Sequence, residues 1–177
     1  KGSATLSADV LVFDEDPSRV AMQTHSLTIK QLDQINPSTD QVRVVIDLLS
    51  ELVLSVQRYG KVLNDWPQLK ERIQSILKRF KRKGGIHTEL AMDTERILRE
   101  VIRQINDTSR NLIDTRPEAL EHTEPRWLAN IISELTRIIS VESAVNVCLV
   151  ITEEQLVFRQ RRTINPKAKM VILDAYG

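Results

Sequence analysis

The sequence predicts a mainly helical protein: a four-helix insertion bundle bracketed by short strands of a partial α/β sheet, with a β-hairpin near the C-terminus. Between residues 38 and 143, apolar residues recur at every third or fourth position, which is the spacing of one buried helix face. Short apolar runs lie near both ends of the chain, at residues 10–13 and 170–173. After residue 143 the apolar pattern changes from helical spacing to the alternation that is typical of paired strands.

Composition limits the classes of partner that the whole chain can attract. The 177 residues carry 25 Lys and Arg against 24 Asp and Glu, so the net charge is +1 and any site for an anionic partner must be local. A content of 41% apolar and 28% charged residues is ordinary for a globular protein. No apolar run is long enough to span a membrane and we find no signal peptide, so we expect a cytoplasmic protein without a membrane partner.

The N-terminal part predicts a strand followed by a short helix. The strand covers residues 9–13 and stops at Asp14, shortly before Pro17. The helix covers residues 27–35, because Pro37 cannot continue it. We assign residues 1–37 to this first part of the protein.

Four longer helices are expected in the second part, residues 38–143. Ser38 or Thr39 is a suitable N-cap for the first of them, and Pro67 suits the first turn of the second. The two glycines that follow Lys83 are expected to end the second helix. The expected helices run over residues 38–64, from 67 to the glycines, over 88–113, and from 125 onward.

The third part, residues 144–177, returns to strand patterns. The segments VNVCLVIT and LVFRQRRTI flank Glu153-Glu154-Gln155, which predicts a hairpin. The segment KMVILDAYG then predicts a strand from Met170 to Leu173 that ends in Asp174. If the two terminal strands are parallel neighbours, Asp14 and Asp174 lie at one edge of the sheet, where α/β proteins gather their ligands, and the helices form an insertion between the strands.

The first of these strands and the residues after it resemble a known sequence motif. The segment VLVFDEDPSRVAMQTHSLTIKQLDQI resembles motif II of superfamily 2 helicases, most of all those of the DinG and XPD group. There, two apolar residues precede Asp-Glu-Ala-His, and a loop leads to a Ser-x-x-Leu/Thr stretch and a Leu-bearing helix. Asp16 and Pro17 replace Ala-His in this chain. The matching residues are Asp14, Glu15, Ser26, Leu27, Thr28 and Leu32.

The C-terminal strand resembles the lead-in to motif III of the same superfamily. In some phage- and plasmid-type helicases this motif reads apolar-apolar-Leu-Asp-Ala-Thr, which Leu173, Asp174 and Ala175 match, whereas Tyr176 replaces the Thr. The resemblance covers residues 10–35 and 164–177. The DinG and XPD group carries a helical arch domain between motifs II and III, which is where the helical segment of this chain lies. The resemblance therefore implies a partial RecA-like sheet with an arch-like insertion.

The resemblance also implies roles for the acidic residues. Asp14 would hold the Mg²⁺ that bridges the β- and γ-phosphates of ATP, and Glu15 would polarise the attacking water. Asp174, Ala175 and Tyr176 would couple the nucleotide site to strand separation. The chain has no Gly-x-x-x-x-Gly-Lys-[Ser/Thr] loop, so we expect a fragment that binds no cofactor and hydrolyses no ATP alone. Mg²⁺ and ATP belong to the parent protein, and the remainder of the helicase core is an expected partner.

Two other interpretations of the acidic ends stay open. The segment FDEDPS also fits the apolar-Asp-x-Asp-x-Ser/Thr opening of haloacid-dehalogenase-like phosphatases, with Asp14 as the nucleophile and Asp16 as the acid and base. That family needs a later acidic pair for Mg²⁺, and none follows here. The interpretation without catalysis is a stand-alone helical interaction module whose acidic strand ends are incidental.

A run of cations forms the other local signal, in the segment KERIQSILKRFKRKGG. It is placed at a predicted helix end and could hold the phosphate backbone of single-stranded or forked DNA, with strong dependence on salt. The alternative is structural, because cations stabilise a helix C-terminus and exposed charge keeps a helical bundle in solution. The residues expected to contact nucleic acid are Lys78, Arg79, Lys81, Arg82 and Lys83.

Overall fold

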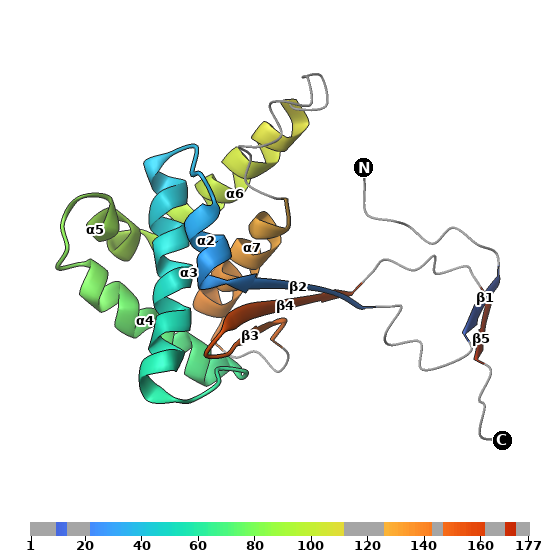
Figure 1. Cartoon of the computed structure of the whole chain (residues 1–177). Coiled ribbons are helices and arrows are strands. Elements are labelled where there is room, and N and C mark those ends of the chain that lie inside the picture. Colours follow the sequence, from blue (N-terminus) through green and yellow to red (C-terminus); the bar gives the residue numbers. More distant parts are fainter. Residues whose placement is uncertain (1–9, 14–21, 112–125, 143–146, 162–168, 173–177) are drawn as a thin grey trace. The chain divides into compact units, whose positions relative to one another are not determined.

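A computed structural model describes residues 10–13, 22–111, 126–142, 147–161 and 169–172. Over these residues the protein is mainly helical, with a three-stranded antiparallel sheet and a separate pair of strands (Figure 1). The helices are α2 (Ile29–Gln34), α3 (Asp40–Tyr59), α4 (Trp66–Phe80), α5 (Gly85–Met92), α6 (Thr94–Asn111) and α7 (Arg126–Ser140). The strands are β1 (Val10–Phe13), β2 (Met22–Thr28), β3 (Leu149–Ile151), β4 (Gln155–Arg161) and β5 (Lys169–Ile172).

The chain divides into two compact units. Residues 26–158 form one unit, and residues 1–25 together with 159–177 form the other. Along the sequence, the helical unit is therefore an insertion between the two segments of the second unit. The sequence-based division into residues 1–37, 38–143 and 144–177 assigns the first and last parts to a helicase core. This assignment stays a prediction.

The two terminal strands pair with each other. β1 and β5 are parallel neighbours, in a register that joins Val10 to Lys169 and Phe13 to Ile172. The expectation of a parallel, adjacent pair near residues 10–13 and 170–173 is confirmed. Nothing in the local sequence of either strand requires this pairing, because the whole helical unit separates them in the chain.

The predicted hairpin is confirmed as β3 and β4. Leu149 pairs with Phe158 and Ile151 with Leu156, and all four side chains are buried on one face of the hairpin. The other edge of β3 is covered by Leu63, which exchanges two backbone hydrogen bonds of 2.9 and 3.0 Å with Ile151. The hairpin is thus held on the helical unit by its apolar face and by its outer edge.

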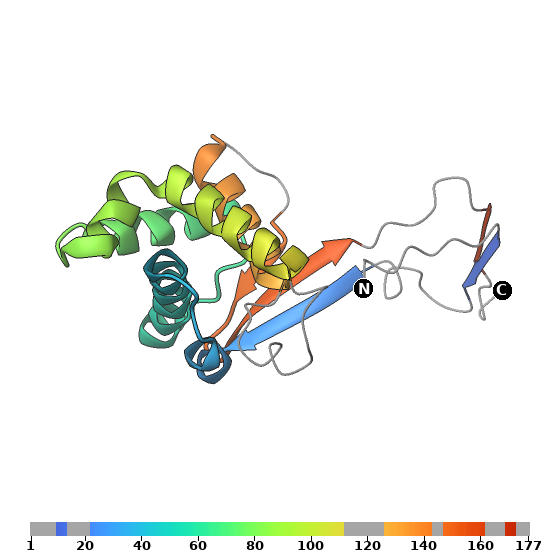
Figure 2. The ribbon, with the colours of Figure 1, turned by 90° about the horizontal axis from the view of Figure 1, so that it is seen from above.

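Strand β2 is a correction to the prediction, which placed a loop and the start of a helix there. It lies beside β4 in the order β2-β4-β3, and Figure 2 shows β2 and β4 pointing in opposite directions. The helix begins only at Ile29, after a capping box between Thr28 and Gln31. The strand alternates exposed Ser26 with buried Leu27, but its residues are so polar that this period is hard to see without the partner strand.

Helix α3 is shorter than predicted and ends at Tyr59 instead of Asn64. Thr39 caps its start, where its hydroxyl accepts the N–H of Val42. Its end is fixed by Gly60, whose φ of 63° lies in the left-handed region and whose N–H donates to Val56 O at 2.7 Å. The prediction missed this C-cap because the apolar spacing continues to Leu63, which belongs to the next connection.

The third predicted helix, residues 88–113, is in fact two helices. Asp93 separates α5 from α6 with φ −136° and ψ 56°, a conformation outside the helical region. It ends α5 by donating its N–H to Glu89 O and begins α6 by accepting the N–H of Ile97. Asp is a favoured N-cap residue, so the sequence contained a signal for this break.

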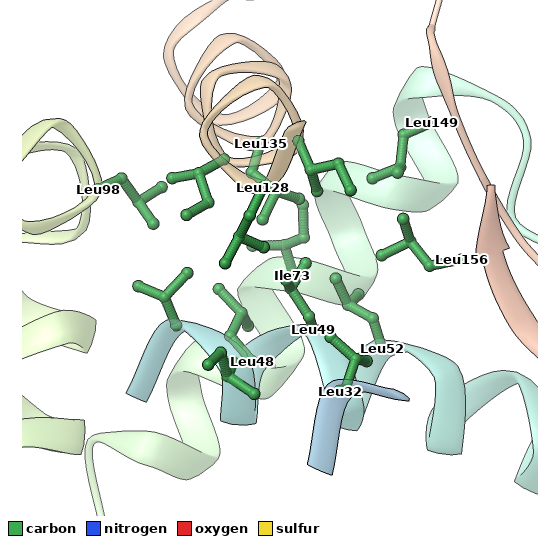
Figure 3. Packing of buried hydrophobic residues seen from close by; sticks show 14 of the residues in the cluster. Leu32, Leu48, Leu49, Leu52, Ile73, Leu98, Leu128, Leu135, Leu149 and Leu156 are labelled. Atoms are coloured by element: carbon green, nitrogen blue, oxygen red, sulfur yellow. The ribbon is translucent and has the colours of Figure 1, made fainter. Parts of the chain in front are cut away.

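The core of the helical unit is built from Leu, Ile and Val. Figure 3 shows side chains from several helices and from the hairpin meeting in one cluster. Ten residues of α3 are buried; α2, α4, α5, α6 and β3 contact this helix, and α7 packs on α4 and α6. The Trp66 Nε1–H donates to Ile138 O at 3.1 Å and so ties the start of α4 to the end of α7.

One buried acidic residue joins α7 to the hairpin. Glu134 is 7% exposed and accepts two hydrogen bonds from the Arg137 guanidinium, at 2.7 and 2.8 Å. Its Oε1 also accepts the N–H of Cys148 at 2.9 Å, just before β3. The Glu134 carboxylate raises the pKa of Arg137 above its usual value. A buried carboxylate with these partners fixes where the chain enters the sheet.

We expect Glu134→Gln to lower the free energy of unfolding by about 1 kcal/mol, because the amide removes one of the two acceptor oxygens that the buried carboxylate offers to Arg137 and to the N–H of Cys148. Urea unfolding followed by tryptophan fluorescence measures this, since both Trp residues lie in the helical unit. The matched control is Glu95→Gln, which breaks an exposed pair with Arg99 and should cost less than about 0.5 kcal/mol. Equal losses in the two variants would contradict the role of Glu134.

Candidate functional site

The predicted acidic residues follow the carboxyl end of the β1–β5 strand pair, and this end of the pair is described by the structure. Phe13 and Ile172 form the last pair of the ladder, and because the strands are parallel, both lead out at the same edge. The predicted site residues follow directly in the sequence: Asp14 and Glu15 after β1, and Asp174, Ala175 and Tyr176 shortly after β5. These five residues lie outside the described segments, so their roles stay predictions.

Metal binding has no further candidate in the described part of the chain. Across residues 10–13, 22–111, 126–142, 147–161 and 169–172, no group of three or more His, Cys, Asp or Glu side chains could hold a metal ion. The described histidine nearest the cations, His87, is bonded instead to Asp47, with 2.9 Å between Nε2 and Oδ2. Its ring meets Phe80 edge to face at 4.8 Å.

The predicted nucleic-acid-binding residues lie together at the end of α4 and in the turn after it. We name them the basic cluster: Lys78, Arg79, Lys81, Arg82 and Lys83. All five are exposed, whereas Phe80 between them is buried and anchors the turn in the core. The chain then turns into α5 through Gly84 and Gly85, whose φ angles of 83° and 57° favour glycine.

Most of the basic cluster has no acidic partner. Arg79 is paired with Glu51 of α3 at 2.9 Å, and the Lys83 ammonium lies 5.0 Å from the Phe80 ring centroid. Among the described residues, Lys78, Lys81 and Arg82 lie within ion-pair distance of no carboxylate. The cluster is therefore a local excess of positive charge in a chain whose total charge is nearly zero.

Helix α6 shows the contrasting arrangement. Among its described side chains, three exposed arginines pair with acidic residues of the same segment: Arg96 with Asp93, Arg99 with Glu95, and Arg103 with Glu100. The Arg103 guanidinium lowers the pKa of Glu100, and Glu100 raises that of Arg103. A charge row of this kind is self-neutralised, so the basic cluster differs from it in pairing and not only in the number of cations.

A second feature, which the sequence did not suggest, lies between the middle of α4 and the end of α3. The Arg72 guanidinium lies 4.5 Å from the centroid of the Tyr59 ring, and Tyr59 is 67% exposed. Arg72 also lines an open pocket, together with Lys61, Leu63, Gln68, Glu71 and Ser75. Tyr59 and Arg72 belong to different helices, so no local pattern pointed to this pair.

Comparisons of the chain with protein-family models, curated proteins and solved structures find no match. In the described segments, no helix combines the length and the apolar composition that crossing a membrane requires. Function is therefore inferred from two local features of the chain: the paired strands that precede the acidic residues, and the unneutralised cations on the helical unit.

Proposed function

We propose that this chain is part of a nucleic-acid-dependent ATPase related to superfamily 2 helicases, running from motif II to motif III. The observation that carries the proposal is the parallel register of β1 with β5, which aligns Phe13 with Ile172. The motif assignment requires this pairing, because both motifs follow neighbouring parallel strands of a RecA-like sheet. Antiparallel or separate strands would have removed the assignment.

The isolated state of the strand pair supports membership of a larger sheet. Parallel strands are found almost only in sheets that are covered on both faces, and a two-stranded sheet is marginal in water. β1 reads Val-Leu-Val-Phe, without the polar residues that a face exposed to water would carry. In the proposed protein, the remaining strands and covering helices come from the rest of a RecA-like core.

The length of the connection supports an insertion. A parallel pair needs a crossover of only a dozen or more residues, and here the crossover contains a complete helical unit, residues 26–158. In the proposed protein this unit is the arch-like insertion, with its four long helices as a bundle, and the protein is cytoplasmic.

The proposed chemistry is divided between this chain and the rest of the core. Asp14 holds Mg²⁺ on the β- and γ-phosphates, and Glu15 orients and polarises the water. Asp174, Ala175 and Tyr176 link the nucleotide site to the movement of nucleic acid. The loop that cradles the phosphates is supplied by the other part of the core, so neither part hydrolyses ATP alone.

The basic cluster is the proposed contact with nucleic acid. No carboxylate of the described residues lies within ion-pair distance of Lys78, Lys81 or Arg82, so a phosphate would break none of the ion pairs that the structure describes. Exposed cations that neutralise phosphates release counterions, which makes binding weaken as salt is added. Single-stranded or forked DNA is the proposed partner.

One prediction of the proposed function concerns the coding sequence upstream of this chain and the ATPase activity of the longer protein. We expect the coding sequence upstream of Lys1 to contain a Gly-Lys-[Ser/Thr] loop. In that longer protein, Glu15→Gln should lower the rate of ATP hydrolysis by about 10² to 10⁴ while ATP binding persists, because it removes the base and not the phosphate cradle. A malachite-green phosphate assay with DNA present and an ATP-binding assay measure the two effects.

Asp16→Asn is the discriminating control for that experiment. The helicase proposal gives Asp16 no part in hydrolysis, so the rate should fall by less than about tenfold. In a haloacid-dehalogenase-like phosphatase the same change removes the acid and base, and loss of phosphatase activity with no ATPase would favour that family. A natural start codon near Lys1 would favour the stand-alone helical module.

The second prediction concerns the basic cluster. For the chain of 177 residues, three phosphate contacts predict that affinity for a fluorescent single-stranded oligonucleotide falls by roughly twentyfold between 50 and 200 mM salt. The variant Lys78→Gln/Lys81→Gln/Arg82→Gln should bind weakly and lose most of this salt dependence. Fluorescence anisotropy measures both.

The matched control removes three charges from α6 instead, as Arg96→Gln/Arg99→Gln/Arg103→Gln. These arginines are already paired with acidic residues, so this variant should retain most of the affinity although its net charge changes equally. Equal losses in the two variants would mean that only total charge matters, and the assignment of the cluster would be wrong.

A further inference from the structure

The exposed side of the α3–α4 pair joins the basic cluster to Tyr59. Two contacts cross between these helices on that side: Arg72 with Tyr59, and Arg79 with Glu51. Arg72 contacts Tyr59 at the end of α3, whereas Arg79, which lies closer to the end of α4, contacts Glu51, which lies closer to the start of α3. The two helices are therefore antiparallel. Seven residues separate Arg72 from Arg79, which places the two contacts about 10 Å apart along α4.

Tyr59 is an unusual residue to leave in solvent. It is the last residue of α3 and is 67% exposed. Among the described residues, the other exposed large apolar side chains are Val62 and Met92. The Arg72 guanidinium lies 4.5 Å from the ring centroid. A guanidinium at this distance limits the motion of Tyr59, and with 67% of the residue exposed, much of the ring is accessible to a ligand.

The surroundings of Tyr59 carry charge that suits phosphate. Lys61 follows it by two residues and lines the open pocket together with Arg72 and Ser75. Lys61 lies near no carboxylate within ion-pair distance in the described part of the chain. Glu71 is the acidic group of the pocket lining, so the more favourable position for a phosphate is on the Lys61 side.

We propose that Tyr59 is a stacking platform for one unpaired base of a single strand, whose backbone runs along the exposed side of α3 and α4 to the basic cluster. This inference rests on the proposed binding of nucleic acid by the helical unit. Aromatic side chains beside a positively charged track are the usual means by which proteins hold single strands without reading their sequence. The separation of about 10 Å is more than one nucleotide along a strand, because the rise is about 3.4 Å per nucleotide in stacked DNA and an unstacked strand is only moderately more extended.

The geometry favours a single strand over a duplex. Stacking on Tyr59 needs a base whose face is free, and bases inside a duplex stack on each other. The combination of one exposed ring, the neighbouring cations Lys61 and Arg72, and the basic cluster at the end of α4 therefore adds a preference that the basic cluster alone does not give. Forked DNA would be held by its single-stranded arm.

The test compares Tyr59→Leu and Tyr59→Phe in binding to two oligonucleotides of 20 units, one of thymidine and one with abasic sites throughout. Stacking predicts that Tyr59→Leu weakens binding to oligothymidine between about fivefold and a hundredfold, and that Tyr59→Phe binds like the unchanged chain. On the abasic strand, all three proteins should bind alike. Because Tyr59 is exposed, tryptophan-monitored urea unfolding should show both variants folded.

Three outcomes would overturn the inference: Tyr59→Leu binding oligothymidine normally, Tyr59→Phe losing as much as Tyr59→Leu, or an equal loss on the abasic strand. If the basic-cluster variant still binds weakly in that case, the proposed nucleic-acid contact stands and only the stacking platform is wrong. If both Tyr59→Leu and the basic-cluster variant bind like the unchanged chain, the proposed nucleic-acid contact itself is wrong. A photo-cross-link from 5-iodouracil to Tyr59, located by mass spectrometry, would support stacking directly.

Discussion

The helical unit depends on the burial of α3 on most of its sides. Ten of its residues are buried, and α2, α4, α5, α6 and β3 all contact it. A helix that is apolar over so much of its circumference cannot remain at a surface, so the other elements must pack around it. Near the contacts with α4, Arg58 and Tyr59 remain exposed and Glu51 is half-buried. The candidate nucleic-acid surface is therefore a consequence of how the core is covered.

The local elements could be predicted wherever a period was uninterrupted or a cap was obvious. The spacing of Leu, Ile and Val identified the helices, and alternation identified the hairpin. The errors have local physical causes. Gly60 ends α3 in a left-handed conformation, and Asp93 divides α5 from α6, although neither changes the apolar spacing. β2 was missed because its own residues are mostly polar and its pairing with β4 decides its conformation.

The candidate site was predictable only where its residues are close in sequence. The basic cluster lies within six consecutive residues and could be recognised from charge alone. The pairing of Arg79 with Glu51 could not, because it depends on how two helices pack. The same holds for Tyr59 with Arg72. The parallel pairing of β1 with β5 was predicted from two apolar runs that each precede an Asp, which is a long-range hypothesis that the structure could have contradicted, whereas the register of the pair is known only from the structure.

The chain passes from one unit to the other in two segments, and these two segments are paired with each other as strands. The unit boundaries fall within β2 and within β4, which lie side by side in one sheet. β2 leads directly into α2 through the capping box at Thr28. β4 leaves the helical unit after Phe158, whose side chain is buried on the apolar face of the hairpin. A strand pair held by hydrogen bonds fixes the spacing and direction of the two segments where they leave the helical unit, which two unpaired connections would not do.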